Sequence, residues 1–329
     1  MTERNADLRP WTAHRPAALY FVENAKIRGT FLTINAHDRW GFLINSLEAY
    51  GYGPADFTPE RSTELVRLAA GVPDLAVKVL GVAPWTASAH VADRYDHGRV
   101  FLAGDAAHEM PPTGGFGLNT GVQDVHNLCW KLAAVLQGRA APALLATYHD
   151  ERQPVGRAIT EQSLANAISM GRLQAQAGNA GARPEYLNEQ GMIFGASYAS
   201  RAIVPDGTPP KPVKDPVTDY APSARPGGRA PHVWVEDSGD GIENGRLSTI
   251  DLVGNGFVLL AAGDTPWGGS DGVRTHAIAD PDFAAAYELE EGGAVLVRPD
   301  GHVGWRARTP PADPAQALAW AMAAIMGHS

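Results

Sequence analysis

The sequence predicts a mixed α/β fold, and three observations carry that prediction. Aromatic and β-branched residues alternate with short turn clusters over residues 18–44, a pattern typical of antiparallel strands. A compact apolar run at 100–103 leads into a loop rich in glycine and proline, and an apolar stripe at helical spacing follows over 118–137. Beyond residue 229, strand patterns and one helix pattern recur, which predicts a second, smaller α/β domain.

The amino-terminal third predicts a small sheet and one helix. Four strands are expected, at residues 18–22, 30–34, 40–44 and 85–91. A short helix lies between the third and fourth strands, with Thr58 as its N-cap, Pro59 at its first position and Gly71 just past its end. The side chains on one side of the 18–44 sheet fit an aromatic pocket and a hydrophobic core equally well, so both interpretations stay open.

A long helix is expected over residues 118–137, where Gly138 supplies the stop. Its apolar residues follow one another at intervals of three and four: Leu118, Val122, Val125, Cys129, Leu132 and Leu136. Such intervals keep these side chains on one helix face, which predicts that this face is buried and that Cys129 is a core residue. Asp124 and His126 fall off that face and are expected in solvent.

A second helix is expected from about residue 142, with Pro154 marking a kink or break. Within it, Glu151 and Arg152 are expected to pair locally. The stretch 205–231 is rich in proline and cannot build continuous helix or sheet, so it is expected to be an extended linker on the surface. Further strands are expected at 250–252, 257–261, 294–297 and 303–305, and a final helix at 314–326.

Composition and charge narrow the class of protein. The 329 residues suffice for two domains, and 44% hydrophobic with 19% charged residues is ordinary for a globular protein. A net charge of −9 without a basic cluster argues against nucleic acid as a partner, and no apolar run reaches the length of a membrane span. The amino terminus is no signal peptide, so a cytoplasmic protein is expected. Cys129 is the sole cysteine, which excludes an internal disulfide and a CxxC or zinc motif, and no metal site is expected.

The stretch 98–119 holds the residues that point to chemistry. An apolar strand ends at Gly104 and Asp105, which places the Asp105 carboxylate at the carboxyl edge of a sheet, where ligands of open α/β sheets bind. Prolines and glycines follow and let the backbone pass close to a flat ligand. The loop ends at the N-terminus of the long helix, whose N–H groups and dipole favour negative charge. A flavin suits these features, with its ribityl hydroxyls donating to Asp105 and its reduced pyrimidine near Leu118 and Asn119.

The stretch GRVFLAGDAAHEMPPTGGFGLNTGVQDVHNLCWKLA resembles the second FAD fingerprint of the group A flavoprotein monooxygenases, the phenol and polyketide aromatic hydroxylases. The resemblance runs on through residues 148–154 and resumes at 225–232 and 295–305. The last two segments are typical of the branch with a thioredoxin-like carboxy-terminal domain. Nearly the whole chain is covered by the resemblance.

The resemblance implies an α/β (α+β) protein with two domains. A partial FAD-binding Rossmann-type domain with a substrate-domain sheet would occupy residues 1–200 and contain the fingerprint at 98–119. A proline-rich linker would span 201–228, and a thioredoxin-like domain would cover 229–329. Because CxxC is absent, this last domain would be structural rather than redox-active.

The resemblance also implies which residues bind the cofactor FAD: Gly104, Asp105, Pro112, Gly114, Gly115, Gly117, Leu118 and Asn119. The backbone carbonyl near Pro111 or Pro112 is expected beside the substrate, as an acceptor for its phenol. No side chain is a secure catalytic acid or base. For Asp105 the alternative to cofactor binding is a structural role as the N-cap of the following turn. His108 is expected to hydrogen-bond the loop backbone, and the alternative is a role as a catalytic base.

The implied activity is monooxygenation, in which NAD(P)H reduces FAD and one oxygen atom of O2 enters an electron-rich aromatic ring. The family's opening strand–GxGxxG–helix unit, which holds the adenosine diphosphate moiety, is not found in this sequence. We therefore expect a truncated or split form that does not work alone, a complementary amino-terminal half acting in trans, and a homodimer. The alternative is a non-catalytic remnant acting as a dimerisation or regulatory module; a third interpretation keeps the fold but exchanges hydroxylation for epoxidation or ring-inserting oxygenation.

Overall fold

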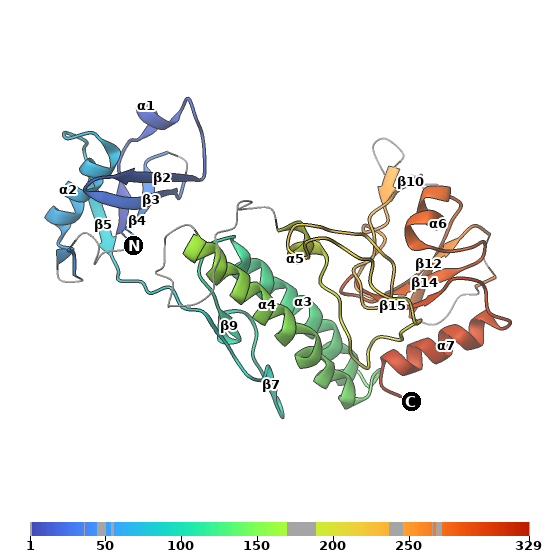
Figure 1. Ribbon diagram of the computed structural model, residues 1–329. Helices are drawn as coiled ribbons and strands as arrows, with labels where there is room; N and C mark the ends of the chain where they lie inside the picture. The colour runs from blue at the N-terminus through green and yellow to red at the C-terminus, as the bar shows by residue number, and fades with distance from the viewer. Residues whose placement is uncertain are drawn as a thin grey trace. The chain divides into compact units, whose positions relative to one another are not determined.

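The computed structural model of the chain describes residues 2–35, 37–44, 51–53, 56–169, 189–236, 246–264, 266–267 and 272–328, with the backbone alone for residues 2–5. The described residues up to Ala87, together with residues 167–169, form one compact unit. The other described residues, from Ser88 onward, form a second unit that contains the 104–119 loop. Figure 1 labels the helices and strands of both units.

The first unit is built around a five-stranded antiparallel sheet with the strand order β2-β3-β4-β1-β5. Its strands are β1 (Thr2–Asn5), β2 (Leu19–Asn24), β3 (Ile27–Thr33), β4 (Arg39–Ile44) and β5 (Lys78–Val82), and a short helix α1 (Arg9–Thr12) follows β1. The predicted meander over residues 18–44 is confirmed as β2, β3 and β4. The predicted strand at 85–91 is wrong, because only β6 (His90–Val91) forms there and its ladder with β9 (His108–Glu109) is two residues long.

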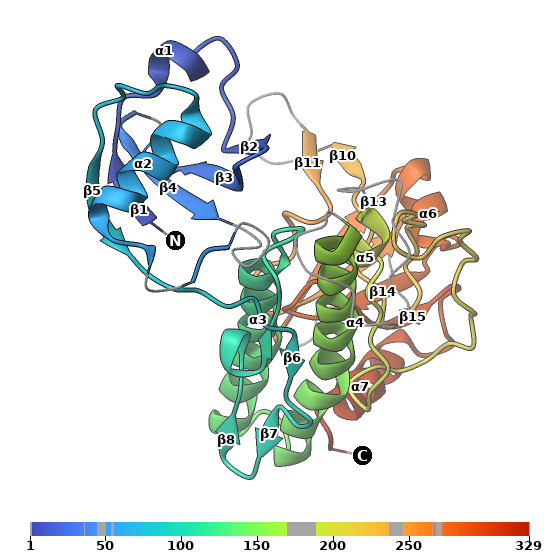
Figure 2. The same cartoon turned by 60° about the vertical axis from the view of Figure 1, so that its left-hand side comes forward.

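Helix α2 (Pro59–Ala70) covers one face of this sheet (Figure 2). Its predicted ends are confirmed: the Thr58 hydroxyl accepts the Arg61 amide at 3.2 Å, and Gly71 closes the helix at φ = +69°. The core between helix and sheet includes Leu65, Val66, Ala69, Phe31, Trp40 and Phe42. Apolar side chains of the sheet thus bury the apolar face of α2, as its sequence pattern indicates.

The opposite face of the sheet carries Leu19 and Phe21, whose side chains are 44% and 56% exposed. They alternate along β2 with Tyr20 and Val22, which pack into the core under α2. Residues 18–44 were open to two interpretations, a hydrophobic core and an aromatic pocket. On the side of the sheet that faces α2, the hydrophobic core is confirmed. The other side presents an accessible apolar surface.

In the second unit, α3 (Phe116–Leu136) lies beside α4 (Thr147–Ser169), whose last three residues count with the first unit, and the short 3-10 helix η4 (Pro142–Ala146) joins the two helices (Figures 1 and 2). Helix α3 confirms the helix predicted over 118–137, and Gly138 follows it at φ = +71°. Of the kink or break predicted at Pro154, the break is wrong, because helix α4 continues through this residue. Buried residues on both sides of the proline, Arg152 and Ile159, anchor the helix and outweigh the lost hydrogen bond.

Two short antiparallel ribbons precede α3, β6 with β9 and β7 (Asp96–His97) with β8 (Val100–Phe101). The apolar strand predicted at 100–103 is thus two residues long, and Val100 is 61% exposed. Within the described residues it pairs with β7 alone, so the expected position of Asp105 at the carboxyl edge of an open sheet is wrong. Asp105 lies instead in the 3-10 turn η3 (Gly104–Ala106).

The carboxy-terminal part of the second unit contains a four-stranded mixed sheet of order β13-β12-β14-β15. Its strands are β12 (Phe257–Ala262), β13 (Val273–Ile278), β14 (Ala294–Val297) and β15 (Val303–Ala307). β12 runs parallel to β13 and antiparallel to β14, which is antiparallel to β15. All of β12 is buried, because α7 (Pro314–Ile325) packs on one side of the sheet and α6 (Pro281–Tyr287) on the other.

The sequence predicts most of this region correctly. The strands at 257–261, 294–297 and 303–305 and the final helix at 314–326 are confirmed. The strand at 250–252 is wrong, because these residues form a turn after β11 (Arg246–Ser248), which pairs with β10 (Trp234–Glu236).

Residues 201–228 contain no helix or strand, as expected for a proline-rich segment, but they are fastened to the sheet. The Gly227 amide donates to the Val303 carbonyl at 2.8 Å, and the Asp206 carboxylate pairs with the buried Arg306 guanidinium at 2.7 Å. One hydrophobic core also joins the sheet to α3 and η4 through Ala134 and Leu144. The carboxy-terminal sheet and the α3–α4 pair are therefore packed together, while the domain boundaries and the thioredoxin-like fold stay predictions.

None of the helices in the described part of the chain is long and apolar enough to cross a membrane.

Candidate functional site

The loop at residues 104–119 follows a path that favours glycine at several points. Gly104, Gly114 and Gly115 have φ values of +59°, +109° and +71°. A Cβ on Gly114 would lie 2.3 Å from the Phe116 ring, so no side chain fits there. The glycine content of the loop and its φ angles both indicate a backbone that can pass close to another group.

The residues predicted to bind the cofactor form the accessible side of this loop. Asp105, Pro112, Gly115, Leu118 and Asn119 are exposed, and Gly104, Gly114 and Gly117 are half-buried. The Asp105 carboxylate takes no hydrogen bond from another described residue, and no side chain caps the turn η3, so its interpretation as an N-cap finds no support. Its acceptor oxygens are turned to solvent.

The N-terminus of α3 is open to an anion. Gly115 occupies the N-cap position in the left-handed region, and no side chain hydrogen-bonds to the first turn. The Asn119 amide donates to the Gly115 carbonyl at 2.9 Å and so points back along the loop. The first N–H groups of a 21-residue helix and its dipole are thus available to a negative group.

Pro111 and Pro112, predicted beside the substrate, differ in their exposure. Pro111 is buried and its carbonyl accepts the Ser163 hydroxyl at 2.5 Å, whereas Pro112 is exposed and its carbonyl accepts the Gly115 amide at 3.2 Å. The Ser163 hydroxyl, from α4, also lies 3.0 Å from the Thr113 carbonyl. Each proline carbonyl keeps a second lone pair for a further donor.

Asp124 fastens the loop to both long helices, a role that the sequence pattern does not indicate. Its carboxylate accepts the Gly104 amide at 3.2 Å and the Arg152 Nε–H at 2.8 Å. Its Oδ2 lies 2.7 Å from His108 Nε2, which carries the proton because its partner is a carboxylate. Asp124 is fully buried, so its expected place in solvent is wrong. His108 is also buried and contacts this carboxylate instead of the loop backbone.

Close backbone contact completes the attachment. A Cβ on Gly121 would lie 3.1 Å from the Gly104 Cα, so the start of the loop rests directly on α3. Asp124 and Ser163 then hold the loop from α3 and α4, at its start and at its middle. These contacts fix the loop backbone from behind and leave its other side accessible.

A second buried cluster lies further along α3 and α4. The Glu151 carboxylate accepts from Lys131 Nζ at 2.7 Å and from two nitrogens of Arg298 at 2.7 and 2.8 Å. Arg298 also pairs with Asp300, whose carboxylate accepts from Asn127 at 3.0 Å. The expected local pair of Glu151 and Arg152 is wrong: the side chains of adjacent helix residues diverge, and Arg152 pairs with Asp124 instead.

Charge pairing governs the ionisation of this cluster. Burial alone would raise the pKa of Glu151, but the charges of Arg298 and Lys131 outweigh it and hold that pKa well below its usual range. Burial lowers the pKa of Lys131 to about 8, against the opposing pull of Glu151. The cluster therefore joins α3 and α4 to the turn between β14 and β15 through charges that depend on one another.

Most of the apolar stripe of α3 lies outside the core, contrary to prediction, and only Leu132 is half-buried and packs on the core that contains Leu128. Leu118, Val122, Val125 and Leu136 are 81%, 60%, 49% and 84% exposed, and Cys129 is exposed too. The buried face carries the polar residues Thr120, Asp124, Asn127 and Lys131, together with Phe116, Leu128 and Ala134. The four polar residues are also spaced by three and four, and this second periodicity was the available signal for the face that the protein buries.

No group of three or more His, Cys, Asp or Glu side chains is arranged to hold a metal ion in the part of the chain that the structure describes.

Comparison with known proteins gives matches over both units. A family described as FAD binding domain matches residues 1–163, and one described as aromatic-ring hydroxylase, C-terminal, matches residues 223–329. Tetracenomycin B2 monooxygenase-dioxygenase of Streptomyces olivaceus is 40% identical over 98% of this chain and 60% of its own length. 2,4-Dichlorophenol 6-monooxygenase of Delftia acidovorans is 34% identical over 92% of this chain and 60% of its own length.

Solved structures show the same likeness. Aklavinone-11 hydroxylase, in a ternary complex with FAD and aklavinone, has a TM-score of 0.84 and 34% identity, covering 99% of this chain and 62% of that one. The flavin-dependent monooxygenase PieE, in complex with FAD and substrate, has a TM-score of 0.79 and 32% identity, covering 100% of this chain and 65% of that one. The chain spans about three fifths of the length of the curated relatives it matches. Residues 1–163 thus belong to the FAD binding domain family and residues 223–329 to the C-terminal family of aromatic-ring hydroxylases, and the chain shares its fold with flavin-dependent hydroxylases of known structure.

Proposed function

We propose that this chain provides the flavin-facing and substrate-facing parts of an FAD-dependent monooxygenase. The enzyme would hydroxylate a phenolic or polyketide aromatic ring with NAD(P)H and O2. The observation that carries the proposal is the 104–119 loop, which is fixed from behind by Asp124 and Ser163 and ends at the uncapped N-terminus of α3. A rigid glycine-rich backbone beside a free carboxylate and an open helix N-terminus suits FAD better than it suits a structural turn.

The residues present fit the flavin part of FAD. Asp105 has exposed carboxylate oxygens that would accept hydrogen bonds from the ribityl hydroxyls, and the first amides of α3, at Gly117 and Leu118, would stabilise negative charge on the reduced flavin. Asp124 is a positioning residue, because it holds Gly104 and the helix in one geometry. When bound, FAD supplies the electron transfer and the oxygen activation, and the protein supplies orientation and exclusion of water.

In the first unit, the open face of the five-stranded sheet is proposed as a contact surface for an aromatic ring. Leu19 and Phe21 lie exposed on this face. An exposed apolar face suits the flat, apolar surface of an aromatic ring. In the second unit, taken by itself, the remaining lone pair of the Pro112 carbonyl is the proposed acceptor for a phenol hydroxyl.

The apolar stripe of α3 is the proposed contact surface for a complementary polypeptide. The sequence contains no GxGxxG turn, and binding of a dinucleotide requires that its pyrophosphate be held as well. Leu118, Val122, Val125 and Leu136 are exposed residues of this stripe, and Leu118 belongs to the flavin loop itself. A polypeptide that covers this stripe is proposed to bring the pyrophosphate-binding turn to the same site in trans.

Two further proposals concern assembly. Residues 229–329 are proposed to serve packing rather than chemistry, because they contain no cysteine and share a hydrophobic core with α3 and η4. A homodimer is proposed for the working enzyme. Sedimentation of the reconstituted protein checks the second proposal, since a dimer has twice the mass of its protomer.

Reconstitution tests the proposed function. The chain is mixed with a polypeptide that carries the family's GxGxxG unit, and bound FAD, NAD(P)H oxidation and product are measured with phenolic substrates under 18O2. We expect a yellow complex and one 18O atom in the product, and Phe21→Ala should raise KM more than it lowers kcat, because Phe21 acts in binding. A complex that binds FAD but incorporates no oxygen into any phenol or polyketide would contradict the activity.

A further inference from the structure

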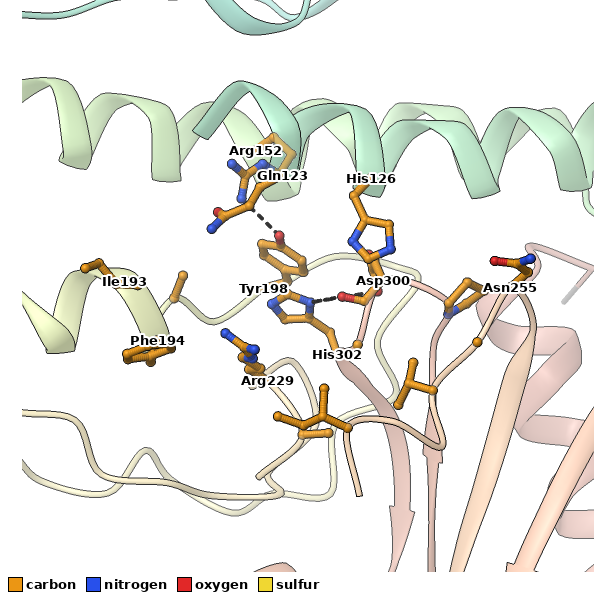
Figure 3. A pocket seen from close by; sticks show the side chains of 17 residues that line it. Gln123, His126, Arg152, Ile193, Phe194, Tyr198, Arg229, Asn255, Asp300 and His302 are labelled. Carbon is orange, nitrogen blue, oxygen red and sulfur yellow. Dashed lines mark hydrogen bonds and ion pairs between the residues drawn. The ribbon is translucent and has the colours of Figure 1, made fainter. Parts of the chain in front are cut away.

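A pocket in the second unit shares no residue with the flavin loop. It has a volume of about 400 Å³ and lies between α3, α5 (Gln190–Phe194) and the turn that joins β14 to β15 (Figure 3). Polar and aromatic side chains reach it from each of these elements: Gln123, His126, Phe194, Tyr198, Arg229 and His302. Pockets that hold small organic ligands start at about 300 Å³, so this volume is sufficient for one.

Arg229 is the unpaired charge in this pocket. Its guanidinium lies 5.3 Å from the centre of the Phe194 ring, and no carboxylate pairs with it among the described residues. The other charged groups of the pocket are already neutralised, Arg152 by Asp124 and Asp300 by Arg298. The pocket therefore has a net positive charge and an unused bidentate donor.

The aromatic side of the pocket lies next to Arg229. The Tyr198 and His302 rings are stacked, with centroids 4.0 Å apart and planes 23° from parallel. A backbone bridge between Arg229 and His302 places these two side chains side by side, as Figure 3 shows. Burial lowers the pKa of His302 to about 4, so the ring is neutral near pH 7 and leaves Arg229 as the cation.

We propose that this pocket binds a small aromatic carboxylate, held by Arg229 through its carboxylate and by the Phe194 and Tyr198–His302 rings through its plane. A guanidinium matches a carboxylate in a flat two-point contact, and neighbouring rings favour a flat ligand. Gln123 and His126 of α3 supply polar contacts for a ring substituent such as a hydroxyl. The site does not depend on FAD, since every residue named belongs to the second unit and none to the 104–119 loop.

Calorimetric titration of the full chain with salicylate tests this site. We expect saturable binding with a Kd below about 1 mM, and at least tenfold weaker binding of salicylamide, which keeps the ring and hydroxyl but not the charge. Arg229→Gln should weaken salicylate at least tenfold, while Arg308→Gln, at an exposed arginine outside the pocket, should leave it unchanged.

Three outcomes would overturn the proposal: no saturable binding of salicylate to the wild-type chain, equal affinity for salicylamide, or unchanged affinity in a folded Arg229→Gln variant. Circular dichroism establishes whether that variant folds. The salicylamide comparison uses the unmodified chain, so it decides the question even if the variant does not fold.

Discussion

Helices α2 and α3 turn opposite kinds of face toward the protein. In α2 the buried side includes Leu65 and Val66, which pack on the aromatic residues of the sheet. In α3 the apolar side is exposed, with Leu118 at 81%, whereas Asp124 and Lys131 are fully buried. Both helices have apolar residues at helical spacing, so the spacing predicts that a helix forms but not which face is covered.

The surface that each helix packs against explains why α2 buries apolar residues and α3 buries charged ones. Helix α2 faces apolar strands, whereas α3 faces α4 and the β14–β15 turn, which offer Glu151, Arg152 and Arg298. A buried charge is tolerated when a partner neutralises it and hydrogen bonds satisfy its remaining atoms. Asp124 meets both conditions, and Lys131 is neutralised by the Glu151 carboxylate.

The largest effect is expected where the charged face of α3 meets the carboxy-terminal sheet. Arg298→Met should lower the free energy of unfolding by about 3–5 kcal/mol, because it leaves the Glu151 and Asp300 carboxylates buried with too few cations. Urea unfolding followed by circular dichroism measures this change. Arg308→Met, at an exposed arginine, is the matched control and should cost little. A loss below about 1 kcal/mol in Arg298→Met would mean that the cluster does not join these elements.

Two matched leucines compare the helices directly. Leu65→Ala in α2 should cost about 2–5 kcal/mol of unfolding free energy, because it opens a cavity in the core of the first unit. Leu118→Ala in α3 should change it by less than about 0.5 kcal/mol, since that side chain is exposed. Unfolding of each variant in urea gives both values. Equal losses would show that the apolar stripe of α3 is packed after all.

The sequence predicts well those features of the fold that depend on neighbouring residues. The caps at Thr58 and Gly71 and the strands β2 to β4 follow from local chemistry, and the pattern of residues near them contains the necessary information. The glycines and prolines of the 104–119 loop likewise reveal its shape before its contacts are known. These features depend on near neighbours in the chain.

The contacts that fix the site depend on distant residues and could not be predicted in this way. Asp124 bonds Arg152, 28 positions along the chain, and Glu151 bonds Arg298, 147 positions along. Spacing on one helix indicates which polar residues share a face, but it does not show that a matching set of charges lies opposite. Asp124 and Glu151 were therefore expected at the surface or in local pairs, and both predictions failed for this reason.

The turn between β14 and β15, against which α3 packs, gives a prediction about how stability depends on pH. Burial lowers the pKa of His302 from 6.5 to about 4, so the unfolded chain binds more protons between these values and stability falls as the pH falls through them. His302→Gln should remove this contribution, up to about 3 kcal/mol, and flatten the pH dependence of the unfolding free energy in that window. His14→Gln, at an exposed histidine, should keep the wild-type slope. An unchanged slope in His302→Gln would contradict the assignment.

The last comparison needs no substitution: the reactivity of the sole cysteine reports whether the apolar stripe of α3 is exposed or covered. Cys129 is exposed on α3, so the native chain should react with a thiol reagent about as readily as the urea-unfolded chain. A complementary polypeptide that covers the stripe should slow this reaction. Slow labelling of the native chain alone would restore the view that Cys129 is a core residue, and unchanged labelling on adding the polypeptide would exclude this face as the contact surface.

The most direct test of the flavin site is the FAD affinity of the reconstituted protein, measured by quenching of flavin fluorescence. Asp105→Ala should weaken binding by about 1.5–3 kcal/mol, roughly 10- to 150-fold, because it removes a charged acceptor of hydrogen bonds from the ribityl chain. Asp93→Ala, at another exposed aspartate of the same unit, should leave the affinity unchanged. If Asp105→Ala binds FAD as tightly as the wild-type protein does, Asp105 does not contact the flavin and the proposed site is wrong.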